Sequence, residues 1–99
     1  MAQTSQTAFI TGASSGIGAA FARRLAADGY NLILHGRRRE LLEELCATLS
    51  RKHNVMAEAI IAELSRPEEV RRLEDRIRNT PDLSILINNA GCSSLKNFH

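Results

Sequence analysis

Short apolar segments alternate with longer amphipathic segments along this 99-residue chain, and this alternation is the feature that most restricts its fold. The apolar segments, which predict β-strands, cover residues 7–11, 31–36, 55–64 and 83–91. The helix-like segments between them cover residues 17–28, 39–53 and 65–79. Strands that alternate with helices form a parallel sheet with crossover helices. The sequence therefore predicts an α/β fold, a Rossmann-like doubly wound parallel sheet.

The same patterns predict where the helices begin, end and face the core. The buried face of the first helix is predicted to carry Ile17, Ala20, Phe21, Leu25 and Ala26. Gly29 is placed to end this helix in the left-handed conformation. Ser65 and Glu68 have the spacing of a capping box, which predicts that the third helix begins near residue 65.

Composition and charge exclude several classes of protein. The length suffices for one small domain over residues 1–99, and the apolar content of 43% argues against disorder. A net charge of +2 gives no reason to expect nucleic acid or a membrane as a partner. The polar N-terminus indicates no signal peptide, and Cys46 and Cys92 form no C-x-x-C pair, which fits a reducing, cytoplasmic location. The histidines and cysteines share no metal-ligand spacing, so no metal is expected.

Three glycines lie between the first strand and the first helix, in the segment FITGASSGIGAAF. A helix N-terminus presents unpaired N–H groups and a partial positive charge, which together favour a phosphate. Gly12 then permits the sharp turn, Gly16 lets the backbone approach a pyrophosphate, and Gly18 lets helix and strand pack closely. Ser14 and Ser15 add hydroxyl donors at the same place. A glycine-rich turn without a ligand is the alternative, whereas a Walker A loop is excluded because no Gly-Lys-Ser/Thr order follows.

Two motifs resemble those of a known family. The loop has the form T-G-x-x-x-G-I-G from Thr11 to Gly18, and the fourth strand ends in NNAG from Asn88 to Gly91. On these motifs the chain resembles the short-chain dehydrogenases/reductases, from residue 7 to at least residue 91. The resemblance implies the strand order 3-2-1-4, and it implies that NNAG holds the sheet together and lines the cofactor.

The resemblance also implies contacts with a dinucleotide cofactor. The N–H groups from Ser15 to Gly18 would face the pyrophosphate. Glu63 and Leu64, at the end of the third strand, would contact the adenine, although most family members have Asp where this chain has Glu63. The segment from Asn89 to Gly91 would run past the adenosine ribose toward the nicotinamide.

The end of the second strand, HGRRRE, bears on the choice between NAD(H) and NADP(H). NAD enzymes usually hold the ribose 2′-OH with an acid at this place, where this chain has Gly36 followed by Arg37. Arg37 can pair with a 2′-phosphate and Arg38 can add charge or stacking, and an anion there would relieve the unfavourable helix dipole. A solvated basic face is the alternative; we favour NADP(H) over NAD(H). The expected cofactor contacts are Gly12, Ser14, Ser15, Gly16, Ile17, Gly18, Arg37, Arg38, Glu63, Leu64, Asn89, Ala90 and Gly91.

The catalytic residues of the family have no counterpart in this chain. The family transfers hydride with a Ser, a Tyr and a Lys, the last two in Y-x-x-x-K spacing, plus an Asn. A tyrosinate exchanges the proton at the carbonyl oxygen, and the Lys lowers the pKa of the tyrosine. The one tyrosine here, Tyr30, has Leu34 at the fourth position after it, and Ser93 and Ser94 follow the last strand too closely. We therefore expect no catalytic residue among these 99 residues.

Three functional classes stay open on this basis. The first is an oxidoreductase that uses NADP(H) on an alcohol or carbonyl substrate, represented by its N-terminal, dinucleotide-binding half, because the family's domain is well over twice this length. The second is a non-catalytic NADP(H)-binding module, and the third is an inactive truncated fragment. A homo-oligomer is expected only for the full-length form. The chain alone is expected to be marginally stable, because the strand at 83–91 leaves an apolar edge open.

Overall fold

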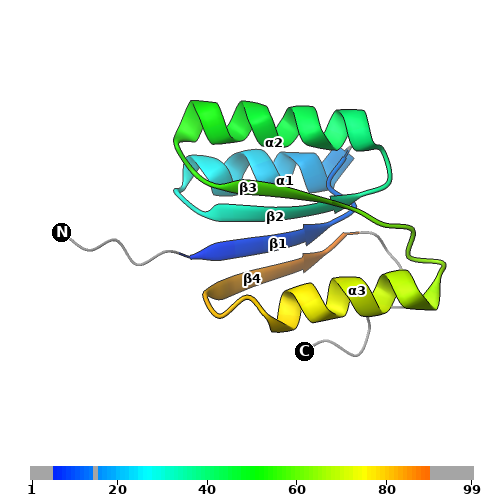
Figure 1. Ribbon diagram of the computed structural model, residues 1–99. Helices are drawn as coiled ribbons and strands as arrows, with labels where there is room; N and C mark the ends of the chain where they lie inside the picture. The colour runs from blue at the N-terminus through cyan, green and yellow to red at the C-terminus, as the bar shows by residue number, and fades with distance from the viewer. Residues whose placement is uncertain (1–5, 15, 90–99) are drawn as a thin grey trace.

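The computed structural model describes residues 6–14 and 16–89, which form a four-stranded parallel sheet with helices on both faces (Figure 1). The elements in chain order are β1 (Thr7–Thr11), α1 (Gly16–Ala27), β2 (Asn31–Gly36), α2 (Arg39–His53), β3 (Ala57–Ile61), α3 (Pro67–Arg78) and β4 (Leu83–Asn88). The strand order is β3-β2-β1-β4, with every pairing parallel. The predicted α/β, Rossmann-like fold and its strand order are therefore confirmed.

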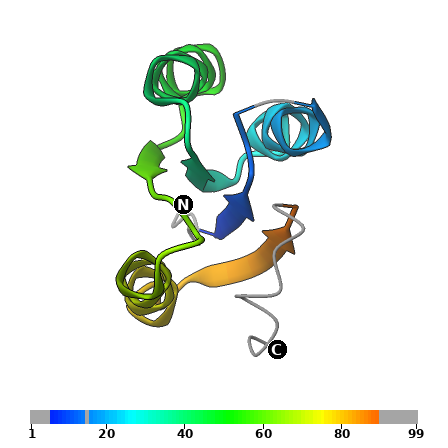
Figure 2. The ribbon, with the colours of Figure 1, turned by 90° about the vertical axis from the view of Figure 1, so that its right-hand side faces the viewer.

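The two helical layers bury opposite faces of the same strands (Figure 2). Ala8 and Ile10 of β1 pack in one core with α1 and α2, whereas Phe9 packs in a second core with α3. In β2, Ile33 joins the α3 core while its neighbours on both sides join the other. Successive side chains of a strand point to opposite faces, so an apolar run of this kind serves two cores at once.

All four strands end at the same edge of the sheet, because every pairing is parallel. Thr11 lies opposite Asn88 in the pairing of β1 with β4, and Gly36 lies opposite Ile61 in the pairing of β2 with β3. The segments that follow β1, β2 and β3 into their helices therefore leave the sheet at one edge (Figure 1). Ligands of open parallel sheets bind at this carboxyl edge.

The buried face of α1 differs from the prediction. Its buried residues are Gly18, Ala19, Ala22 and Ala26, whereas Ile17 is 67% exposed and Phe21 is 44% exposed. Ala20 is also exposed, whereas Leu25 is half-buried and packs against the core, and Ala26 is buried as predicted. The prediction was wrong for Ile17, Ala20 and Phe21, because the helix packs tightly against the loop after β1, where a Cβ at Gly18 would already overlap the Gly12 carbonyl oxygen. The line of small residues at Gly18, Ala22 and Ala26 therefore faces inward, and the larger side chains turn outward.

The predicted capping box is also absent. The residue before α3 is Arg66, and its side chain makes no capping hydrogen bond; Pro67 is the first helical residue, where its missing N–H has no cost. Ser65 Oγ instead donates to the Glu63 carboxylate at 3.2 Å. Strands β3 and β4 are shorter than predicted, because β3 covers only Ala57–Ile61 and β4 ends at Asn88. Gly29 has φ +93° just after α1, as expected for a left-handed helix end.

Strand β4 lies at the edge of the sheet, as predicted. Within the described residues it pairs only with β1, and Ile85, Leu86 and Ile87 are half-buried. None of the described helices has the length and hydrophobicity needed to cross a bilayer.

Adjacent leucines of α2 test the placement of this helix on the sheet. Leu42 is 0% exposed and Leu41 is 43% exposed, so the same substitution is expected to act differently at the two positions. We expect Leu42→Ala to lower the free energy of unfolding by about 2–5 kcal/mol, because it leaves a cavity in the core. Leu41→Ala should lower it by less than about 1 kcal/mol. Urea denaturation followed by circular dichroism measures both, and equal losses would contradict the placement.

Candidate cofactor site

The loop after β1 turns sharply at two glycines. Gly12 has φ +64° and Gly16 has φ +60°, both in the left-handed region that residues with a side chain rarely adopt. Gly16 is exposed, and a Cβ added there would have no heavy atom within 4 Å, so open space lies beside the backbone at the start of α1. The first turn of a helix carries unpaired N–H groups, so this space suits a phosphate. Ser14 is half-buried in the same loop, and Ser15 lies outside the described residues.

Gly18 lies where the helix and the loop come closest. A Cβ on Gly18 would overlap the Gly12 carbonyl oxygen and would lie 2.8 Å from Asn89 Nδ2. Asn89 Nδ2 donates to that same carbonyl oxygen at 3.1 Å. The predicted close packing at Gly18 is therefore present, and the space is shared with a side chain from the NNAG motif.

Asn88, the first asparagine of NNAG, bonds to the last residue of β1. Thr11 Oγ1 donates to Asn88 Oδ1 at 3.0 Å. The structure thus brings the two sequence motifs, which are far apart along the chain, into direct contact at the carboxyl edge. Ala90 and Gly91, which complete the motif, lie outside the described residues, as does Cys92.

His35 is a site residue that the sequence analysis missed. It is 3% exposed, and its Nδ1 accepts the Gly12 N–H at 3.1 Å, while its Nε2 lies 3.0 Å from the Ala62 carbonyl oxygen. The carbonyl of His35 also accepts the Ala13 N–H at 2.8 Å. Because the Gly12 amide can only donate, Nδ1 must accept and Nε2 must carry the proton. Desolvation by burial lowers the pKa of His35, which favours this neutral form. The signal in the sequence that could have identified His35 is its position as a histidine within the apolar run of β2.

Gly36 stands at the end of β2, where NAD enzymes usually carry an acid. A Cβ on Gly36 would lie 3.1 Å from Ser14 Cβ and 3.1 Å from Ser14 Oγ, so a side chain there would require a small shift of Ser14. The loop after β1 therefore rests directly on the end of β2.

Arg37 lies beside the carboxylate of Glu63, which is distant from it in the sequence. Arg37 Nη1 is 3.8 Å from Glu63 Oε1, and the two side chains are 72% and 44% exposed. An exposed ion pair of this length contributes about 0–1 kcal/mol, so Arg37 stays available to an anionic ligand. Arg38 is exposed at the N-cap of α2, and Leu64 is buried beside the α3 core. The structure thus brings the predicted Arg37 and Glu63 together at the carboxyl edge.

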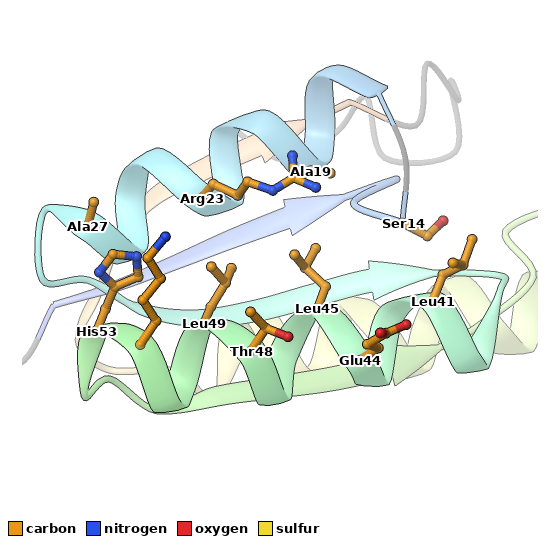
Figure 3. A pocket seen from close by; sticks show the side chains of 11 residues that line it. Ser14, Ala19, Arg23, Ala27, Leu41, Glu44, Leu45, Thr48, Leu49 and His53 are labelled. Carbon is orange, nitrogen blue, oxygen red and sulfur yellow. The ribbon is translucent and has the colours of Figure 1, made fainter.

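Two other features involve α1 and α2. A groove of about 490 Å³ runs between these helices, from Ser14 at one end to His53 at the other (Figure 3). Cys46 is buried in α2, and burial raises the pKa of its thiol to about 11, so the thiol is unreactive at neutral pH. In the part of the chain that the structure describes, no group of three His, Cys, Asp or Glu residues is placed to hold a metal ion.

Comparison with known proteins identifies the family. A sequence model of the short chain dehydrogenase family matches residues 6–99. The chain belongs to the short-chain dehydrogenase family. A short-chain dehydrogenase from Sphingobium yanoikuyae, solved in complex with NADPH, superimposes with a TM-score of 0.84 at 45% identity, over 87% of this chain and 34% of that chain.

Two curated relatives are named as a reductase and a dehydrogenase. It is 36% identical to a very-long-chain 3-oxoacyl-CoA reductase of Yarrowia lipolytica, over 87% of this chain and 23% of that protein. It is 42% identical to a serine 3-dehydrogenase of Agrobacterium fabrum, over 88% of this chain and 34% of that protein. The chain therefore spans a quarter to a third of the relatives it matches, the part that holds the cofactor loop.

Gly18→Ala tests the contact between α1 and the loop. Alanine in place of a helical glycine usually stabilises by about 1 kcal/mol. Here we expect the opposite, a loss of about 1–3 kcal/mol in the free energy of unfolding, because the new Cβ displaces the Gly12 carbonyl. The NMR signal of the Gly12 amide should shift as well.

Gly29→Ala is the matched control. It strains the backbone at a glycine with φ +93°, but nothing lies within 4 Å of the added Cβ, and the position is remote from the loop. It should destabilise the chain without moving the Gly12 signal. A stabilising Gly18→Ala variant would contradict the geometry.

Proposed function

We propose that this chain is the dinucleotide-binding part of an NADP(H)-dependent short-chain dehydrogenase that oxidises alcohols or reduces carbonyl compounds. The observation that carries the proposal is the carboxyl edge itself, which holds the exposed N-terminus of α1 and the exposed Arg37, with no acid at the end of β2. The open space at Gly16 suits the pyrophosphate, because the first turn of a helix has N–H groups without intrahelical partners.

Arg37 supports NADP(H) over NAD(H). The acid that would hold a ribose 2′-OH is absent at Gly36, where an added Cβ would also contact Ser14 closely. A guanidinium forms strong, charge-assisted hydrogen bonds with phosphate, and Arg37 is bound only weakly by Glu63. The similar enzyme from Sphingobium yanoikuyae was solved with NADPH, which agrees with this choice.

The work of this chain is to bind and orient the cofactor. NADP(H), when bound, supplies or accepts the hydride. Gly12, Ser14, Gly16 and the first turn of α1 would hold its pyrophosphate, and Glu63 with Leu64 would border the adenine. Asn89 would begin the segment that leads to the nicotinamide, followed by Ala90 and Gly91.

A non-catalytic NADP(H)-binding module is the second candidate. The observation in its favour is the absence of a Tyr-x-x-x-Lys sequence from these 99 residues, since Tyr30 is followed at that spacing by Leu34. Tyr30 packs against the core formed with α1 and α2, at the end of β2 opposite the loop. Both candidates bind the same cofactor, so cofactor binding is tested first.

Calorimetric titration with NADP⁺ and NAD⁺ tests the choice of cofactor. We expect Arg37→Gln to weaken NADP⁺ binding about ten-fold and to leave NAD⁺ binding unchanged, because one charge-assisted pair with the 2′-phosphate is lost. Arg39→Gln is the matched control, since it removes the same charge from the start of α2 at a side chain held by Glu43 at 3.2 Å. An equal loss of NADP⁺ affinity in both variants would show that Arg37 acts only through its charge. A chain without saturable NADP⁺ binding would refute the proposal.

An activity assay tests whether the chain itself carries catalytic groups. We expect the 99-residue chain to oxidise no NADPH in the presence of carbonyl compounds, because it holds no Tyr-Lys pair to transfer the proton. Absorbance of NADPH, with a complete short-chain reductase as positive control, measures this. Oxidation above background would show that the chain carries catalytic groups that its sequence does not reveal.

A further inference from the structure

His35 connects three separate segments at the carboxyl edge. Its ring accepts the Gly12 N–H and lies against the Ala62 carbonyl just after β3, and its backbone carbonyl accepts the Ala13 N–H. The first two residues of the glycine-rich loop are thus both bonded to this one residue of β2. The carbonyl of Gly12, which belongs to the next peptide unit, is held by Asn89.

These bonds require a neutral ring. Both ring nitrogens of a protonated histidine are donors, so Nδ1 then points an N–H at the N–H of Gly12. The hydrogen bond at 3.1 Å is lost and two like dipoles face each other, whereas the bond from Nε2 to Ala62 survives. Protonation therefore acts on one partner only, the glycine-rich loop.

We propose that His35 is the positioning residue of the glycine-rich loop, and that protonation of its Nδ1 releases Gly12 and weakens dinucleotide binding in acid. The inference rests on the proposed function, because it names a residue that sets the geometry of the same site. His35 itself is buried beneath the loop and makes no contact with the space beside Gly16. It acts through Gly12 and Ala13.

The charged groups around His35 come from three elements. Arg37 follows β2 and Arg72 lies on α3, and both disfavour a second positive charge, whereas Glu63, after β3, favours one. Desolvation is the largest influence and lowers the pKa of His35 below the ordinary 6.5. Stability from the neutral ring is therefore complete above the pKa of an unfolded histidine and is lost as the pH falls toward the lower pKa of the folded chain.

NADP⁺ titrations between about pH 8 and about pH 5 test the proposal with three variants. His35→Gln offers one acceptor and one donor that do not titrate, His35→Leu offers neither, and His53→Gln is the matched control at a histidine remote from the loop. We expect the wild-type dissociation constant to rise about five-fold more than that of His35→Gln over this range, the effect of one backbone hydrogen bond. The phosphate of NADP⁺ titrates near pH 6 in every experiment, so only the difference between proteins counts.

The remaining variants test whether the pH effect on NADP⁺ binding comes from His35 alone. His53→Gln should keep the wild-type pH profile, and His35→Leu should bind about five-fold more weakly than His35→Gln at about pH 8. Circular dichroism at each pH reports whether each variant is folded. Equal pH profiles for wild type and His35→Gln would overturn the proposal, and so would a ring that stays neutral until the chain unfolds.

A readout without cofactor keeps this inference separate from the proposed function. In the cofactor-free chain, the NMR signal of the Gly12 amide should shift with the same midpoint as the His35 ring. That shift in a chain that binds no NADP⁺ would support the positioning role and refute the proposed function. A Gly12 signal that ignores the titration of His35 would overturn the positioning role, whatever the chain binds.

Discussion

The structure depends on how one residue, Gly12, is held on both sides of its Cα. His35 accepts its N–H from β2, and Asn89 donates to its carbonyl from the end of β4. A loop that leaves a sheet edge with positive φ has no regular partners for its backbone groups, and buried groups without partners are costly. These two side chains satisfy the N–H and the carbonyl of Gly12 and fix the direction in which the chain enters α1. The position of the helix N-terminus, and hence of any phosphate bound there, follows from this.

The packing of α1 follows from the same constraint. Since the helix must start within contact of the Gly12 carbonyl, its inner face can carry only small side chains near the loop, and Gly18 meets that requirement. Ala22 and Ala26 continue the small face along the helix. The outward position of Ile17 and Phe21 is the consequence. A hydrophobic pattern read alone favours the larger residues for the core, and here steric room near the loop overrules it.

At the carboxyl edge, the same residues serve both the packing of the loop after β1 and the cofactor binding that we propose. Gly36 leaves room for Ser14, which lets the loop rest on β2, and it brings no acid to the end of this strand. Arg37, the next residue, is exposed and only loosely paired with Glu63. The preference we propose for a 2′-phosphate thus rests on the glycine at the end of β2 as well as on the charge of Arg37. Leu64 and Glu63 border the same place from the β3 side.

The sequence by itself determined the strands and helices, their order and the family. Periodicity, the T-G-x-x-x-G-I-G loop and NNAG suffice for these, because each is a local pattern with a local cause. Element ends were less certain: Ser65 was predicted to cap α3 and instead donates to Glu63, since a hydroxyl can bond to whichever acceptor the fold brings near. Only the tertiary structure decided the role of His35, the pairing of Arg37 with Glu63 and the inner face of α1. Each of these depends on groups from different elements that meet at one sheet edge, and the spacing of residues along the chain does not predict which of these groups lie close together.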